Sequence, residues 1–266
     1  MSVLDPVTHA LAAALATAHH TLEPLLDPLP SGVLWVAAIT TLVVGVRLLV
    51  LPLAVHGVRQ AHASARARPA LQDLARRHRG ARSPEAVAAY RAARAEVARE
   101  NGVSRLGCLP LLVQVPVWIG LYHLLSDVAG GQQVGAMGSD LVASVASATL
   151  LGVPLVARGY VGGATHVAVV AALAGTVAVL SFVTQRFLVA PNQVLDGVPE
   201  AVARAQALMP ALTALGMLVA ASVVPVALLV YWLVNATWTA GQAAVVVRRF
   251  PTPGSPAALA RASRTG

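Results

Sequence analysis

Residues 45–53 read "GVRLLVLPL" and place one arginine inside an apolar segment. From residue 33 to residue 55, Arg47 is the only charged side chain. An arginine at the centre of a helix in lipid costs roughly 2.5–3.5 kcal/mol on insertion scales. The guanidinium group of Arg47 must therefore either reach the membrane surface or lie in polar surroundings within the protein.

The composition is that of an integral membrane protein. Apolar residues make up 57% of the 266 residues and charged residues only 11%, and the mean hydropathy is +0.70. A water-soluble chain carries about 25% charged residues. The single cysteine, Cys108, excludes a disulfide or a cysteine-based zinc site within one chain. The first twenty residues contain no arginine or lysine, so we expect no cleaved signal peptide.

Five segments are apolar enough to cross a bilayer, which takes about 20 helical residues. They are residues 31–55, 106–126, 166–183, 207–222 and 223–247. The third and fourth are short, which predicts a small hydrophobic thickness.

The arginines predict the orientation of these spans. Residues 56–105 hold eleven of the nineteen arginines, and six more follow residue 185. Arg158 stands alone on the opposite side of the five alternating spans. Because cytoplasmic loops carry the excess of basic residues, we expect an outer N-terminus and a cytoplasmic C-terminus.

The polar insert, residues 56–105, reads as a cytoplasmic helical hairpin with arms at about 59–79 and 85–100. Ser83 and Pro84 form an expected N-cap and first-turn pair for the second arm. At the other end of the chain, residues 7–22 are expected to form an amphipathic helix lying on the outer surface.

Several polar side chains lie within or at the ends of the predicted spans, and together they are able to line a cavity around Arg47. They are Gln114, Trp118 and His123 in the second span, Ser181, Thr184 and Gln185 at the end of the third, and Trp232, Asn235, Thr239 and Gln242 along one face of the fifth. Each alone is compatible with ordinary helix–helix hydrogen bonding, and Arg47 could snorkel to the surface. Together they favour one polar cavity. No carboxylate lies within a span, so we expect water and passing substrate, rather than a residue of the chain, to receive the charge of Arg47.

Three sequence blocks carry a family resemblance. They are "VRLLVLPLAVHGVRQAHASARARPALQDLARRHRG" (46–80), "GVSRLGCLPLLVQVPVWIGLYHLL" (102–125) and "VVPVALLVYWLVNATWTAGQAAVVVRR" (223–249). Their order, the Arg with Pro-Leu five residues later and the Gly-Cys-Leu-Pro opening resemble the YidC-type membrane protein insertases of bacteria (the YidC/Oxa/Alb family), in a small form with five spans.

The resemblance implies an all-α polytopic membrane protein, with five transmembrane helices around a polar groove and a cytoplasmic helical hairpin. The implied domains are an extracytoplasmic amphipathic segment (1–30), an insertase core (31–249) and a cytoplasmic tail (250–266). Arg47 matches the groove arginine of the family, and Gln185 and Trp232 match polar groove positions. Helical spacing adds Gln114 and Asn235 to the expected groove.

The function implied is insertion and folding of integral membrane proteins in the bacterial cytoplasmic membrane, with nascent membrane proteins as substrates. The Sec translocon, the ribosome and the signal recognition particle machinery are candidate partners, beside the lipid bilayer itself. No catalytic residue, cofactor, metal or specific nucleic acid is expected. His19 and His20 are expected to be exposed and without partners.

Other functions remain open at this point. A small-molecule or anion transporter would also use an intramembrane arginine and a polar stripe, although the two halves show no internal repeat. A role purely as an assembly chaperone overlaps with insertion. The arginines of the hairpin could contact RNA or anionic lipid electrostatically, but Tyr90 is its only aromatic residue.

Overall fold

The computed structural model describes residues 5–80, 83–104, 109–195 and 198–265. Their elements in chain order are α1 (Asp5–Leu26), α2 (Ser31–Leu49), α3 (Leu51–Arg77), α4 (Pro84–Glu100), α5 (Leu109–Ala129), α6 (Ser139–Ser147), β1 (Thr149–Leu150), β2 (Val153–Pro154), α7 (Ala164–Val183), η1 (Thr184–Val189), η2 (Ala190–Asn192), α8 (Glu200–Ala220), α9 (Val226–Arg249) and α10 (Pro256–Thr265). The Gly-Cys-Leu-Pro opening of the second predicted span begins outside the described residues.

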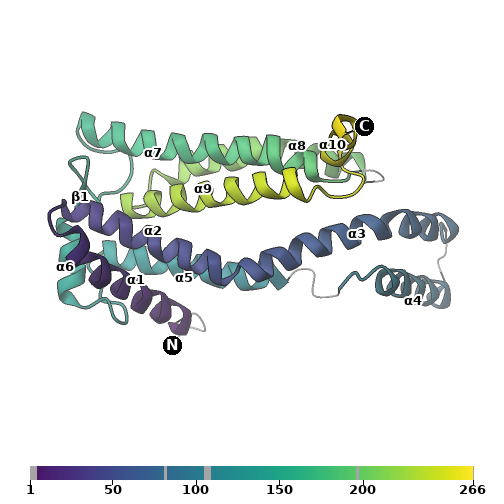
Figure 1. Cartoon of the computed structure of the whole chain (residues 1–266), viewed down its shortest axis with the longest axis horizontal. Coiled ribbons are helices and arrows are strands. Elements are labelled where there is room, and N and C mark those ends of the chain that lie inside the picture. The colour runs from purple at the N-terminus through teal and green to yellow at the C-terminus, as the bar shows by residue number, and fades with distance from the viewer. Residues whose placement is uncertain (1–4, 81–82, 105–108, 196–197, 266) are drawn as a thin grey trace.

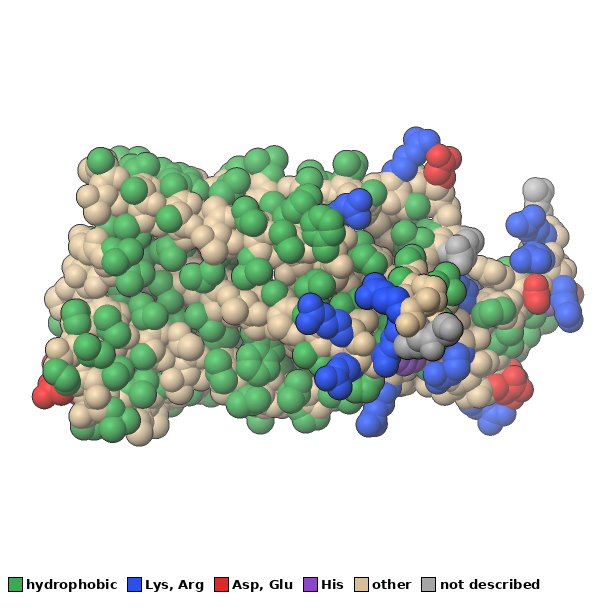
Figure 2. Space-filling model, turned by 45° about the horizontal axis from the view of Figure 1, so that its top comes forward, with side chains coloured by type: hydrophobic (Ala, Val, Ile, Leu, Met, Phe, Trp, Pro, Cys, Tyr) green, Lys and Arg blue, Asp and Glu red, His purple; other side chains and the backbone are tan. Residues whose placement is uncertain are grey.

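The protein is an all-α membrane protein built on a bundle of long helices (Figure 1). α9 contacts α2, α5 and α7, and α8 packs on α7. Three stretches of the described chain are long and apolar enough to cross a membrane: Ser31–Leu49, Ala164–Asn192 and Glu200–Ala220. Hydrophobic side chains cover the body of the bundle, whereas arginines gather towards the end that carries α10 and the hairpin of α3 and α4 (Figure 2).

The segment predicted as one helix over 31–55 is divided into two, because α2 and α3 meet at Val50. Pro52 lies in the first turn of α3, where its missing N–H leaves no hydrogen bond unmade. α3 then runs unbroken into the hairpin, so the first arm does not begin at residue 59. The second arm, α4, begins as predicted, with the Ser83 hydroxyl accepting a hydrogen bond from the amide of Ala86 at 3.2 Å.

The third and fourth apolar segments form longer helices than the sequence predicted. α7 continues through the π-helical turn η1 and the 3-10 turn η2, so that the helical stretch extends from Ala164 to Asn192. α8 begins at Glu200 rather than at residue 207. Hydropathy falls at Gln185, Arg186 and Arg204, but helix formation continues through these residues because polar side chains leave the backbone hydrogen bonds intact.

Residues 132–158 form a cap at the end of the bundle opposite the hairpin of α3 and α4 (Figure 1). The cap contains α6 and the β1–β2 hairpin, in which Thr149 pairs with Pro154. The amides of Val226 and Ala227 donate to the carbonyls of Ala157 and Leu155, each at 2.9 Å. The cap thus satisfies two of the backbone donors that a helix leaves open at its N-terminus.

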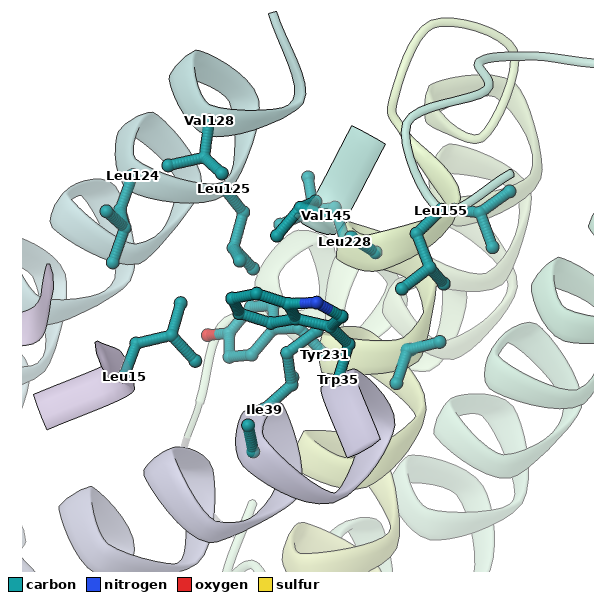
Figure 3. Close-up of a cluster of buried hydrophobic side chains, with 14 of the residues drawn as sticks. Leu15, Trp35, Ile39, Leu124, Leu125, Val128, Val145, Leu155, Leu228 and Tyr231 are labelled. Atoms are coloured by element: carbon teal, nitrogen blue, oxygen red, sulfur yellow. The ribbon is translucent and has the colours of Figure 1, made fainter. Parts of the chain in front are cut away.

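A buried apolar cluster joins the cap to the bundle. Trp35 of α2, Val145 of α6, Leu228 of α9 and Leu155, which follows β2, lie together in this cluster (Figure 3). The indole N–H of Trp35 donates to the Ser144 hydroxyl at 3.1 Å, so this large side chain is buried without leaving its donor unpaired. The bundle is therefore closed by packed side chains at the cap end.

α1 is part of this core rather than a helix lying freely on the surface. Leu11 and Leu15 are buried, and α1 packs against both α2 and α5. His19, predicted to be exposed, is only 4% exposed and its ring lies 4.3 Å from that of Trp35, centroid to centroid. The prediction failed because alanine dominates both faces of α1, which hides the buried face in the sequence.

Candidate functional site

Arg47 has partners within the chain, contrary to the expectation that water and substrate alone receive its charge. Its Nε and Nη2 atoms donate to Oδ1 of Asn235 at 3.1 and 2.6 Å. Nη2 also donates to the Thr239 hydroxyl at 3.0 Å. These acceptors are neutral, so the guanidinium is oriented but its charge is not cancelled.

The local structure of α9 explains this geometry. Asn235 and Thr239 are one turn apart and therefore lie on the same face of the helix, which packs against α2. The Thr239 hydroxyl also donates back to the Asn235 carbonyl at 2.8 Å, which aims its lone pairs away from its own backbone and towards Arg47. The polar stripe predicted on the fifth span thus supplies the acceptors.

Beside this pair lies a cavity of about 400 Å³ between α5, the α7–η1 junction, α8 and α9. Its lining residues are Trp118, Ser181, Thr184, Gln185, Thr213, Gly216, Met217, Ala220, Trp232, Asn235, Ala236 and Thr239. None of these residues of the described chain is acidic or basic. Hydroxyl and amide groups therefore give the cavity its polarity, and Arg47 is connected to it through two residues of its wall.

Three of the five predicted groove residues meet in this cavity: Gln185, Trp232 and Asn235. Arg47 contacts the wall without lining the cavity itself. Gln114, half-buried on α5, is one turn from Trp118 but is not among the lining residues that the structure describes.

Sequence reasoning missed the contribution of α8. Thr213, Gly216 and Ala220 of this helix line the cavity with Met217. Small residues at spacings of three and four mark the face of a helix that allows close approach. That spacing is visible in the sequence. Only Thr213 among these residues is polar, however, so the spacing did not indicate a cavity.

Two of the helices that line the cavity, α5 and α8, also carry exposed large apolar side chains. On α5, Leu112 is 61% exposed and Trp118 is 48% exposed. On α8, exposed residues include Leu208, Leu212, Leu215 and Val219. Exposed apolar surface of this extent is expected where lipid or another apolar segment covers it.

One cluster of potential metal ligands lies elsewhere in the described residues. The ligand atoms of His19, His20 and Glu23 on α1 lie within 4.8 Å of one another, and His20 Nδ1 is 3.7 Å from a Glu23 carboxylate oxygen. Two imidazoles and a carboxylate suit zinc chemically. Two of the three side chains are exposed, however, and none of the three is among the described residues that line the cavity, so the site described above does not depend on this cluster.

The comparisons with known proteins converge on one family. Residues 30–253 match the model of the 60Kd inner membrane protein family. A relative from Streptomyces avermitilis, named membrane protein insertase YidC, is 30% identical over 86% of this chain and 55% of its own length. Relatives with the same name from Bifidobacterium longum (26% identity; 92% of this chain, 75% of theirs) and Tropheryma whipplei strain Twist (25%; 100% and 90%) are also similar. The chain thus spans about half of the Streptomyces relative and most of the other two. These matches give no support to a small-molecule transporter.

Proposed function

The chain belongs to the 60Kd inner membrane protein family, and from this premise we propose that it inserts integral membrane proteins and helps them fold. The cavity beside Arg47 would receive the hydrophilic segment of the incoming protein. The apolar segment of the substrate would pass into lipid along the outward faces of α5 and α8. No covalent step is involved, so the proposal requires neither a cofactor nor a catalytic residue.

The observation that carries the proposal is an oriented, uncancelled arginine beside a cavity whose mainly apolar lining includes hydroxyl and amide side chains. Arg47 is fixed by Asn235 and Thr239, both of which line the cavity. A charge within a low-dielectric bundle attracts an opposite charge far more strongly than it would in water. An acidic or polar segment of a substrate would therefore be drawn to this point.

The cap supports a cavity that is closed on one side only. Buried residues such as Met137 and Leu155 fill the cap end, so a segment that enters the cavity meets packed side chains there. Entry from the hairpin end, followed by release sideways into lipid, is consistent with this geometry.

We further propose five spans, formed by α2, α5, the α7–η2 stretch, α8 and α9. Arg158 is the one arginine on the cap side, and the hairpin and tail carry most of the others, which supports an outer N-terminus and a cytoplasmic C-terminus. The proposed domains remain 1–30, 31–249 and 250–266. Proposed partners are nascent membrane proteins, and beside them the Sec translocon, the ribosome and the signal recognition particle machinery.

The proposal is tested by reconstituting the protein into lipid vesicles and adding a small single-span substrate with an acidic translocated tail. Protection of the tail from added protease measures insertion. Wild type is expected to protect the tail, Arg47→Ala to lose most of this activity, and Arg47→Lys to retain it, because lysine keeps the charge.

The outcomes separate the parts of the proposal. Insertion that is indifferent to Arg47→Ala would remove the arginine from the mechanism and leave the insertase. Absence of insertion by the wild-type protein, together with an anion flux that depends on Arg47, would refute the insertase itself.

A further inference from the structure

The last part of the chain folds back onto the end of the bundle. Residues 250–255 turn the chain, and the Thr252 amide donates to Oδ1 of Asn192 at 2.7 Å. Nη1 of Arg261 on α10 donates to the carbonyls of Arg248 and Arg249 at 3.0 and 2.9 Å. These carbonyls belong to the last turn of α9, where a cation is favoured by the helix dipole and by the unmade backbone bonds. α10 is therefore attached to the bundle at two points.

This fold-back borders a second, open pocket of about 820 Å³ between α9, α10 and the η1–η2 turns. Its lining residues are Phe187, Pro191, Val247, Arg248, Arg249, Pro256, Ala257, Ala260, Arg261 and Arg264. We refer to it as the tail pocket. Four arginines converge on it, and Figure 2 shows arginines gathered towards this end of the molecule.

The residues that line the tail pocket carry an excess of positive charge. None of its lining residues is acidic. Elsewhere in the described residues, Arg76, Arg99 and Arg204 each pair with a carboxylate. Arg248, Arg249 and Arg264 have no such ion pair among the residues described. Like charges held close together are unfavourable unless an anion joins them.

The rest of the pocket is apolar and lies at the end of a membrane-type segment. Phe187 is 60% exposed, and with Val247 and Pro191 it forms an uncharged wall. Phe187 and Pro191 belong to the stretch Ala164–Asn192, which is long and apolar enough to cross a membrane. A ligand that matches both parts carries an anionic head and apolar chains.

We propose that the tail pocket binds the phosphate headgroup of an anionic phospholipid. The guanidinium groups of Arg248, Arg249 and Arg264 provide the charge-assisted hydrogen bonds that phosphate prefers. The acyl chains of the lipid continue along the apolar wall into the bilayer. Basic pockets beside membrane helices on the cytoplasmic side recognise lipid headgroups in this way; only the choice of leaflet rests on the proposed orientation.

The apolar wall favours a lipid over other phosphate-bearing ligands. Inorganic phosphate would satisfy the arginines but would leave the apolar wall formed by Phe187, Pro191 and Val247 uncovered. RNA would offer bases for stacking, yet Phe187 is the one aromatic side chain among the described residues that line the pocket, whereas single-stranded nucleic acid is bound on several.

The test measures the affinity of the purified full chain in neutral detergent for phosphatidylglycerol and for phosphatidylcholine, by native mass spectrometry. The pocket variant is Arg248→Gln/Arg249→Gln/Arg264→Gln, which leaves the tether Arg261 intact. The matched control is Arg59→Gln/Arg77→Gln/Arg79→Gln, with the same change of charge at three exposed hairpin residues. Arg264→Gln alone changes one residue near the exposed end of α10, so it provides a test of the pocket even if the triple variant does not fold.

The wild type and the control are expected to prefer phosphatidylglycerol. The pocket variant is expected to bind it about 100-fold more weakly, and Arg264→Gln about 5-fold more weakly, since each arginine near a membrane surface contributes about 1 kcal/mol. Equal affinity of the pocket variant and the control would overturn the proposal. Displacement of the lipid by inorganic phosphate, or pocket-dependent binding of a short RNA without any lipid preference, would overturn it as well. Because no insertion is measured, the result is independent of the proposed function.

Discussion

Replacing Asn235 by aspartate tests whether the charge of Arg47, rather than its position, serves insertion. Oδ1 of Asn235 accepts from two guanidinium nitrogens of Arg47, at 3.1 and 2.6 Å. An aspartate has the same shape and accepts the same two bonds, but it carries the negative charge that an acidic substrate would otherwise supply. Asn235→Asp therefore keeps the geometry and cancels the charge.

The size of the effect follows from the separation of the two groups. Unit charges about 4 Å apart interact by about 4 kcal/mol at an effective dielectric constant of 20. Burying the new carboxylate offsets part of this energy. Even one third of it, about 1.4 kcal/mol, corresponds to a tenfold change in affinity for an acidic segment.

The assay is insertion into vesicles of two substrates that differ only in the charge of the translocated tail. Asn235→Asp is expected to slow insertion of the acidic tail at least tenfold, to leave the basic tail unimpaired, and to unfold at a temperature no lower than wild type. Asn192→Asp is the matched control. It makes the same change at the hairpin end, where Oδ1 accepts from the Thr252 amide. Undiminished insertion of the acidic tail by Asn235→Asp would refute the reasoning.

Two further predictions concern stability, measured by thermal unfolding in detergent. A Cβ added to Gly32 would lie 1.9 Å from the Thr149 carbonyl oxygen, whereas one added to Gly45 on the same helix meets nothing within 4 Å. Gly32→Ala should therefore destabilise the folded state by about 1–3 kcal/mol, while Gly45→Ala should stabilise it by about 1 kcal/mol. Equal effects of the two substitutions on the unfolding temperature would contradict the close contact at Gly32. Burial lowers the pKa of His19 below its usual 6.5, and both ring nitrogens are buried without a partner among the described residues. The folded state thus favours the neutral ring, so the stability that His19 contributes is present above pH 6.5 and is lost as the pH falls below it. His19→Leu should reduce this loss of stability in acid without lowering the unfolding temperature near pH 8. An unchanged dependence of the unfolding temperature on pH would exclude His19 as its source.

Much about this protein follows from the sequence, because the properties concerned depend on local composition and spacing. A chain with 11% charged residues cannot cover itself in water, which predicted the membrane protein. Three sequence blocks predicted the family, and the match of residues 30–253 to the family model confirms it. Ser83 and Pro84 predicted the start of α4, since an N-cap acts within one turn. The spacing of Trp232 and Asn235 placed both on one face of a helix.

Tertiary structure decided what depends on contacts between distant segments. Arg47 and Asn235 are 188 residues apart, and no helical periodicity indicates that these two side chains meet. α8 contributes a wall of the cavity through small residues, whose role lies in the space they leave. Gln114 has the same chemistry as Gln185 but is not among the described residues that line the cavity. Composition and period determine what a helix is made of and which side chains share a face; the packing of one helix against another determines which of those faces enclose a site.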